Sequence, residues 1–292
     1  MAAVLALAIA WLYAGTMEGL GREWLSSPDA SYGLVLAGVA LLLLWQRRGQ
    51  IAAAARSSTG SRFPAAGFGV LLAGLLLYLM GQLGADVFIT RVSLVIVIAG
   101  ALWSVAGGSA ARMAAAPLVF LLLAVPLPAL VVNTITLPLQ LTASRIAEAT
   151  LVASGIPVFR DGNVLELPSA SLEVAQACSG LRSLVSLTAI AGLLAWAATA
   201  RTPTRGSKLS LFGRGAAIVA IAIPIAILMN GLRIAAVGIL CEVWDPRVTS
   251  GGWHTFTGWI TFVASIVVLM EVQRALAPRP AAPDAVEGAM AA

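Results

Sequence analysis

Residues 213–241 read GRGAAIVAIAIPIAILMNGLRIAAVGILC, and after Arg214 the only charge in this stretch is Arg233. A helix needs roughly 20 consecutive apolar residues to cross about 30 Å of hydrocarbon, and the stretch exceeds that length. A charge inside such a helix costs at least about 2.5 kcal/mol unless it has a partner. The stretch therefore predicts a membrane-spanning helix, and Arg233 marks a candidate functional position within it.

The rest of the chain has the same apolar character. Of its 292 residues, 60% are hydrophobic and 11% are charged, and the mean hydropathy is +0.94, which lies outside the range of soluble globular domains. The N-terminal stretch lacks a basic n-region and is interpreted as a span rather than a cleavable signal peptide. The sequence predicts an all-α, polytopic integral membrane protein with about eight spans: residues 2–17, 32–46, 65–83, 87–107, 114–132, 178–199, 213–241 and 254–273.

The segment between the fifth and sixth spans, residues 133–177, is too polar to be another span. Pro126 and Pro128, just before it, are expected to kink or end the fifth span. LTASRIAEATLVASG, residues 141–155, predicts an amphipathic interfacial helix ended by Gly155. Asp161-Gly162, between two extended-looking runs, predicts a hairpin. We expect a small extracytoplasmic cap of helix and hairpin that leads into the sixth span.

The basic residues predict the orientation, because lysine and arginine accumulate in short cytoplasmic loops. We therefore expect both termini to be cytoplasmic and the protein to lie in the cell inner (plasma) membrane. Most acidic residues then fall on the outer side. The basic residues on the inner side are Arg47, Arg48, Arg56, Arg62, Arg112, Arg201, Arg205, Lys208, Arg214, Arg274 and Arg279. Residues 1–277 form the predicted transmembrane domain. The tail 278–292, rich in alanine and proline, is predicted to be disordered and cytoplasmic.

Composition also narrows the kinds of ligand. The net charge is +5, but aromatic residues do not interleave with the arginines as they do in nucleic-acid binding surfaces, so no nucleic-acid partner is expected. Two cysteines and one histidine exclude a metal cluster or a zinc site of several imidazoles. The chain has no gapped glycine motif for a nucleotide. We expect neither a metal nor a cofactor.

Three reactive side chains fall near the predicted outer membrane face. Cys178 opens the sixth span, Arg233 lies in the outer part of the seventh, and His254 begins the eighth. A thiolate is the nucleophile of a cysteine enzyme, and a helix N-terminus together with Arg182 at i+4 would lower the pKa of the thiol. An imidazole can exchange a proton near neutral pH. A guanidinium can bind an oxyanion or a carboxylate, so the three residues predict thiol catalysis.

Two other residues near Cys178, Arg233 and His254 could support this chemistry. Asn230 precedes Arg233 by three residues and shares its helix face, where its amide could orient the guanidinium. Gly258 follows His254 by four residues and would allow another backbone or a substrate to approach closely.

The candidate residues also have structural interpretations that involve no catalysis. Cys178 could be a small apolar filler or form a disulfide with Cys241. Arg182 could reach to the lipid headgroups. His254, beside Trp253, could be an interfacial anchor.

Three segments together resemble the exosortase/archaeosortase family: residues 137–184 (LPLQLTASRIAEATLVASGIPVFRDGNVLELPSASLEVAQACSGLRSL), 230–240 (NGLRIAAVGIL) and 253–259 (WHTFTGW). The resemblance is specific from about residue 117 to 262. It implies a catalytic triad of Cys178, Arg233 and His254. It further implies neighbouring motif positions at Glu173, Ser179, Gly180 and Asn230. The chain departs from many members in having no histidine in its first outer loop, near SYG at 31–33.

The resemblance implies a sortase-like cysteine transpeptidase that acts on exported proteins. Their C-terminal tails carry a short motif such as Pro-Glu-Pro, then a transmembrane helix, then a basic cluster. The implied partners are these proteins and membrane lipids. Two other classes stay open: a transporter, which would need polar residues at mid-depth where spans three to five hold almost none, and an assembly scaffold for exopolysaccharide export.

Overall fold

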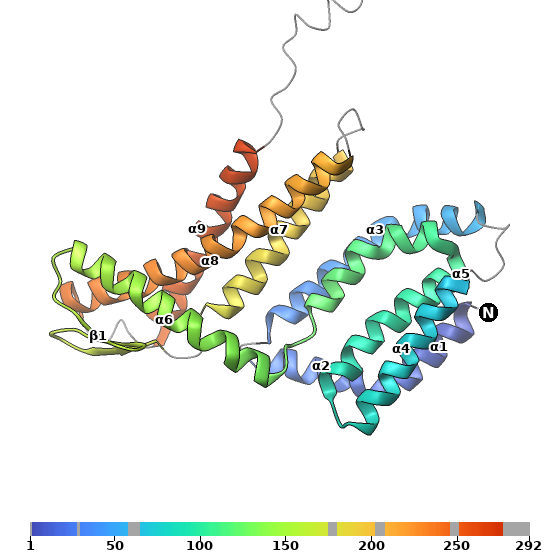
Figure 1. The fold of residues 1–292 in the computed structure, drawn as a ribbon, viewed down its shortest axis with the longest axis horizontal. Helices are drawn as coiled ribbons and strands as arrows, with labels where there is room; N and C mark the ends of the chain where they lie inside the picture. Colours follow the sequence, from blue (N-terminus) through green and yellow to red (C-terminus); the bar gives the residue numbers. More distant parts are fainter. Residues whose placement is uncertain are drawn as a thin grey trace, which may run out of the picture. The chain divides into compact units, whose positions relative to one another are not determined.

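The computed structural model describes residues 2–27, 30–57, 65–174, 180–201, 208–245 and 251–276. Within these ranges, it describes the side chains of all but 198–201, 208–212, 251, 254 and 255. The predicted all-α class is confirmed, since helices dominate and one small sheet accompanies them (Figure 1). The elements are α1 (Ala2–Leu12), α2 (Ala14–Ser26), α3 (Tyr32–Ser57), α4 (Ala65–Leu83), α5 (Val87–Leu123), α6 (Ala129–Ala153), β1 (Phe159–Asp161), β2 (Val164–Glu166), β3 (Ser171–Glu173), α7 (Leu181–Arg201), α8 (Lys208–Val243) and α9 (Gly251–Ala275).

The helices form a polytopic membrane protein, although the predicted count of eight spans is not confirmed. Five helices among the described residues are long and apolar enough to cross a membrane: Tyr32–Arg56, Ala65–Leu83, Val87–Leu123, Gly213–Val243 and Phe256–Ala275. The predicted first span, 2–17, is a pair of helices that meet at 61° and could make a sixth. The predicted sixth span, 178–199, contains a shorter apolar helix, Leu181–Ala197.

The predicted fourth and fifth spans, 87–107 and 114–132, correspond to one kinked helix, α5. The kink is at Gly107, whose φ of 83° is not helical. The predicted end near Pro126 and Pro128 is confirmed, because α5 ends at Leu123. Residues 129–132 were assigned to the fifth span, but they belong to α6, whose first turn includes a bond from the Val132 amide to the Pro128 carbonyl. A proline can precede a helix because the first turn needs no backbone donor there.

The two compact units of the chain are Met1–Leu141 with Ala175–Ala189, and Thr142–Val174 with Ile190–Ala292. In the first unit, α4 packs on α5 through buried glycines at every seventh position, Gly67, Gly74 and Gly81. A Cβ on Gly74 would lie 2.9 Å from the backbone nitrogen of Val97. Small residues allow such close helix contacts in membranes, where apolar surface alone gives little drive for association.

In the second unit, the predicted cap is confirmed in part. The helix predicted at 141–155 is the second half of α6, which is followed by Gly155 at a φ of 79°. The predicted hairpin is β1 and β2, joined at Gly162 and paired antiparallel with Asp161 opposite Val164. No sequence pattern predicted β3, which pairs antiparallel with β2. The location of this segment at the membrane interface stays a prediction.

Helix α8 packs closely against α6 at Gly231. A Cβ there would lie 2.6 Å from Cβ of Ile146 and 3.2 Å from the carbonyl oxygen of Ala143. Farther along α8, a Cβ on Gly238 would lie 3.1 Å from Leu151. These two glycines allow α8, the helix that carries Arg233, to approach α6 closely.

Replacing Gly231 by alanine is expected to destabilise the protein by about 1–3 kcal/mol, because the added methyl group overpacks this contact. The free energy of unfolding in detergent measures the effect. Gly213→Ala in the same helix is the matched control, since a Cβ there meets no atom within 4 Å. Equal stability of the two variants would show that the α6–α8 contact is not tight.

Candidate active site

Of the three predicted catalytic residues, the structure describes the side chain of Arg233 alone. Cys178 lies outside the described residues, as does the neighbouring Ser179. His254 lies in the first turn of α9, and its side chain is outside the described part. The gathering of the three groups in one pocket therefore stays a prediction.

Arg233 lies on α8 and faces α9, which packs against it. Its Nη1 is 3.4 Å from the position that a Cβ on Gly258 would occupy. Its Nη2 is buried and has no hydrogen-bond partner among the described atoms. Gly258 follows His254 by one turn of α9, so the guanidinium lies against the helix that carries the histidine, on the face that both positions share.

An unpartnered guanidinium nitrogen in an apolar helix pair is costly, since buried charged groups are normally paired or hydrogen-bonded. The donor is thus available to an acceptor that the described part of the chain does not supply. A carbonyl oxygen, an oxyanion or a carboxylate would fit, because guanidinium nitrogens only donate. Asn230, one turn earlier on α8, is 4% exposed and stays on the same helix face.

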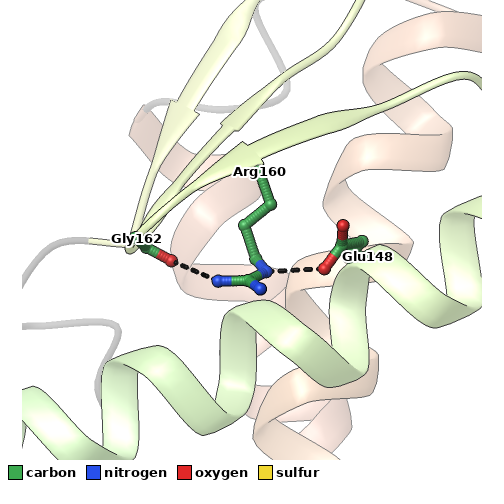
Figure 2. A network of polar contacts seen from close by, with 3 residues as sticks. All are labelled: Glu148, Arg160 and Gly162. Atoms are coloured by element: carbon green, nitrogen blue, oxygen red, sulfur yellow. Dashed lines mark hydrogen bonds and ion pairs between the residues drawn. The ribbon is translucent and has the colours of Figure 1, made fainter.

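The three-stranded sheet is attached to the helices at two points. Figure 2 shows the first, where Nε of Arg160 on β1 lies 2.5 Å from Oε2 of Glu148 on α6, and Nη1 donates to the carbonyl of Gly162 at 3.2 Å. At the second, the Ser169 amide and hydroxyl both donate to Oε1 of Glu242 on α8, at 2.9 and 2.6 Å.

These contacts fix the sheet over the ends of α6 and α8. Glu173, the last residue of β3, is exposed on this sheet five residues before Cys178. The sheet therefore sets the position of the residue from which the chain continues to the predicted nucleophile.

The start of α7 differs from the prediction. The helix begins at Leu181 rather than at Cys178, and Gly180 has a φ of 81°, which is not helical. The Gly180 carbonyl accepts the first bond of the helix, from the Leu184 amide. The predicted i+4 relation of Cys178 and Arg182 on one helix face is therefore wrong. Arg182 is exposed in the first turn of α7.

Comparison with protein families matches residues 24–271 to the family described as Transmembrane exosortase (Exosortase_EpsH). The chain belongs to the transmembrane exosortase family. The matched range covers every predicted site residue, from Glu173 to His254. Comparisons with curated proteins and with solved structures find no match.

The second cysteine of this exosortase is a free thiol. Cys241 is 2% exposed, and its Sγ lies 3.5 Å from Oγ of Ser169. A disulfide between Cys241 and Cys178 was one alternative reading of the sequence, and the structure does not form it.

Three aromatic side chains form a cluster beside His254 in the chain, and the sequence did not predict that they would contact one another. The ring centroids of Trp244 and Trp253 are 5.3 Å apart, and those of Trp253 and Phe256 are 6.0 Å apart. All three side chains are exposed. Exposed tryptophans are typical of the membrane–water interface, so the cluster supports an interfacial position for the start of α9. The i, i+3 spacing of Trp253 and Phe256 was the available signal.

Proposed function

We propose that this chain is a membrane-embedded cysteine protease or transpeptidase that cleaves C-terminal sorting tails from exported proteins. The observation that carries the proposal is the buried Nη2 of Arg233, which has no hydrogen-bond partner among the described atoms and belongs to a guanidinium beside Gly258, one turn from His254. Membership of the exosortase family supports the same reaction class. The chemistry that follows assigns one step to each residue of the triad.

In the first half-reaction, the Cys178 thiolate attacks the carbonyl carbon of the scissile peptide bond. The carbonyl oxygen becomes an oxyanion and accepts from Arg233, whose Nη2 has no partner among the described atoms. The C–N bond then breaks, and His254 gives a proton to the leaving amine. The tail leaves with a new amino terminus, and the rest of the substrate is held as a thioester.

In the second half-reaction, a nucleophile attacks the thioester carbonyl, His254, neutral after the first half-reaction, takes the nucleophile's proton, and the thiolate leaves. Water gives a free carboxylate and makes the enzyme a protease. An amine or another acceptor gives a new bond and makes it a transpeptidase. Arg233 serves both half-reactions, because each passes through a tetrahedral intermediate in which the same carbonyl oxygen becomes an oxyanion.

In the proposed orientation, the active site lies on the outer, periplasmic side of the inner membrane and both termini lie in the cytoplasm. The basic loops support it through the positive-inside rule. A substrate whose tail contains a transmembrane helix would hold the preceding peptide at that face. The substrates are accordingly exported proteins with a C-terminal motif, a membrane helix and a basic cluster, of the kind that carry a Pro-Glu-Pro motif.

The proposal predicts a thioester that hydroxylamine can capture. Purified protein incubated with a tailed substrate and hydroxylamine should yield a shortened substrate that ends in a hydroxamate, together with the released tail. Mass spectrometry of both fragments measures the products and locates the cleaved bond. Release of the tail with no hydroxamate, at any hydroxylamine concentration, would contradict the thioester route.

A further inference from the structure

A second polar site lies in the first unit. A cavity of about 480 Å³ opens there between the end of α2, the α4–α5 connection and the segment that follows α5. Its lining includes Arg91 together with the carboxylates Glu23 and Asp86. None of these residues has a part in the proposed reaction.

Arg91 is the buried charge of this cavity. The residue is 8% exposed, and Nη1 lies 2.6 Å from Oε2 of Glu23. Its Nε is buried and has no hydrogen-bond partner among the described atoms. A guanidinium has five N–H donors, so the pairing with Glu23 leaves donor capacity unused. Arg91 lies in the predicted fourth span, although almost no polar residues were expected at mid-depth in spans three to five.

The two carboxylates limit what the cavity can bind. Glu23 keeps 38% of its side chain exposed. Asp86 caps α5 by accepting from the Ile89 amide at 2.9 Å, and one carboxylate oxygen is enough for that bond. A simple anion would meet two negative charges here, and a simple cation would meet the buried guanidinium. A ligand that carries both charges avoids both conflicts.

Apolar side chains flank the same cavity. Val87 lines it and is 58% exposed, while Leu83 and Leu130, next to lining residues in the chain, are 81% and 79% exposed. In a membrane protein, such exposed apolar side chains contact lipid chains. The site therefore offers polar groups to a head and apolar groups to a tail, which is the pattern of a phospholipid.

We propose that this cavity binds the zwitterionic head group of a phospholipid whose ammonium carries hydrogens. The phosphate accepts from Arg91, and the ammonium donates to Glu23 and Asp86. A trimethylated ammonium has no N–H to donate, so the site prefers phosphatidylethanolamine to phosphatidylcholine. The lack of a positive group disfavours phosphatidylglycerol.

The test offers the full-length protein an equimolar mixture of these three lipids in nanodiscs. Native mass spectrometry after gentle release then counts the lipids that stay bound. We expect phosphatidylethanolamine to be enriched about fivefold, the factor that one charge contact is worth at a membrane surface. Equal retention of the three lipids would overturn the proposal.

Three variants and one competitor complete the test. Arg91→Gln should lose the enrichment, and Asp86→Asn should lose the preference over phosphatidylcholine while keeping the helix cap, since asparagine is a good cap. If Arg91→Gln does not fold, Asp86→Asn decides alone. Arg22→Gln, which breaks an exposed ion pair with Glu18 on α2, should change nothing. Full phosphatidylethanolamine enrichment in folded Arg91→Gln protein, or an unchanged preference over phosphatidylcholine in Asp86→Asn protein, overturns the proposal. Free phosphoethanolamine that displaces the lipid at equal concentration also overturns it, because the ligand would then be a soluble zwitterion.

Discussion

Replacing Cys178 by alanine is expected to lower removal of the sorting tail by roughly 10⁴-fold or more, which is the scale for loss of a catalytic nucleophile. Without the thiol no thioester forms, and the remaining groups cannot replace it. The measurement is the ratio of full-length to trimmed substrate in cells that carry each variant. The amount of exosortase in the membrane fraction is measured alongside and should not change.

Cys241→Ala is the matched control, because Cys241 is the only other cysteine in the sequence. Its buried thiol contacts Ser169 and has no role in the proposed reaction, so this variant should keep its activity within a few-fold. A membrane-impermeant maleimide should label Cys178 from outside the cell in the Cys241→Ala protein. Continued trimming by Cys178→Ala would show that another group is the nucleophile, and absent labelling from outside would contradict the proposed orientation.

Apolar runs predicted the membrane-spanning helices because burial in lipid requires the whole backbone to be hydrogen-bonded within a helix. Boundaries were less predictable. Pro126 and Pro128 marked the end of α5, but a proline tolerates a helix start equally well, and α6 begins at Ala129 rather than at the predicted Leu141. Gly107 breaks α5 by its own backbone conformation, which composition does not reveal.

At the candidate site too, sequence patterns predicted relations between neighbouring residues better than contacts between distant ones. The sequence predicted a close approach at Gly258, four residues after His254, and the structure brings Arg233 to that glycine. The same reasoning failed at Gly180, because a glycine in a sequence gives no sign of whether its φ is positive. The pair of Arg91 and Glu23 joins residues 68 positions apart. No local pattern could predict it, since the partner of a buried charge is chosen by tertiary packing.

Replacing Arg233 by methionine is expected to reduce cleavage by about 10²–10³-fold, the loss that follows removal of one oxyanion donor. The same change should leave the free energy of unfolding unchanged or raise it. Nη2 of Arg233 is buried and has no partner among the side chains that the structure describes, and replacing a buried charge by an apolar side chain of similar volume is often neutral or stabilising. A residue that served only to hold α8 and α9 together would show the opposite pattern, with lost stability and activity falling in step.

The two readouts therefore separate catalysis from structure, and two further variants sharpen the separation. Arg233→Lys keeps a positive charge but not the planar fork of donors, so its activity should lie between those of the methionine variant and the parent. Arg214→Met removes an exposed arginine from the other end of α8, where the guanidinium contacts the Leu276 carbonyl, and it should leave cleavage intact. Normal trimming by a folded Arg233→Met protein would remove the oxyanion role, because a donor held unpaired at a cost in stability would then have no acceptor in the reaction.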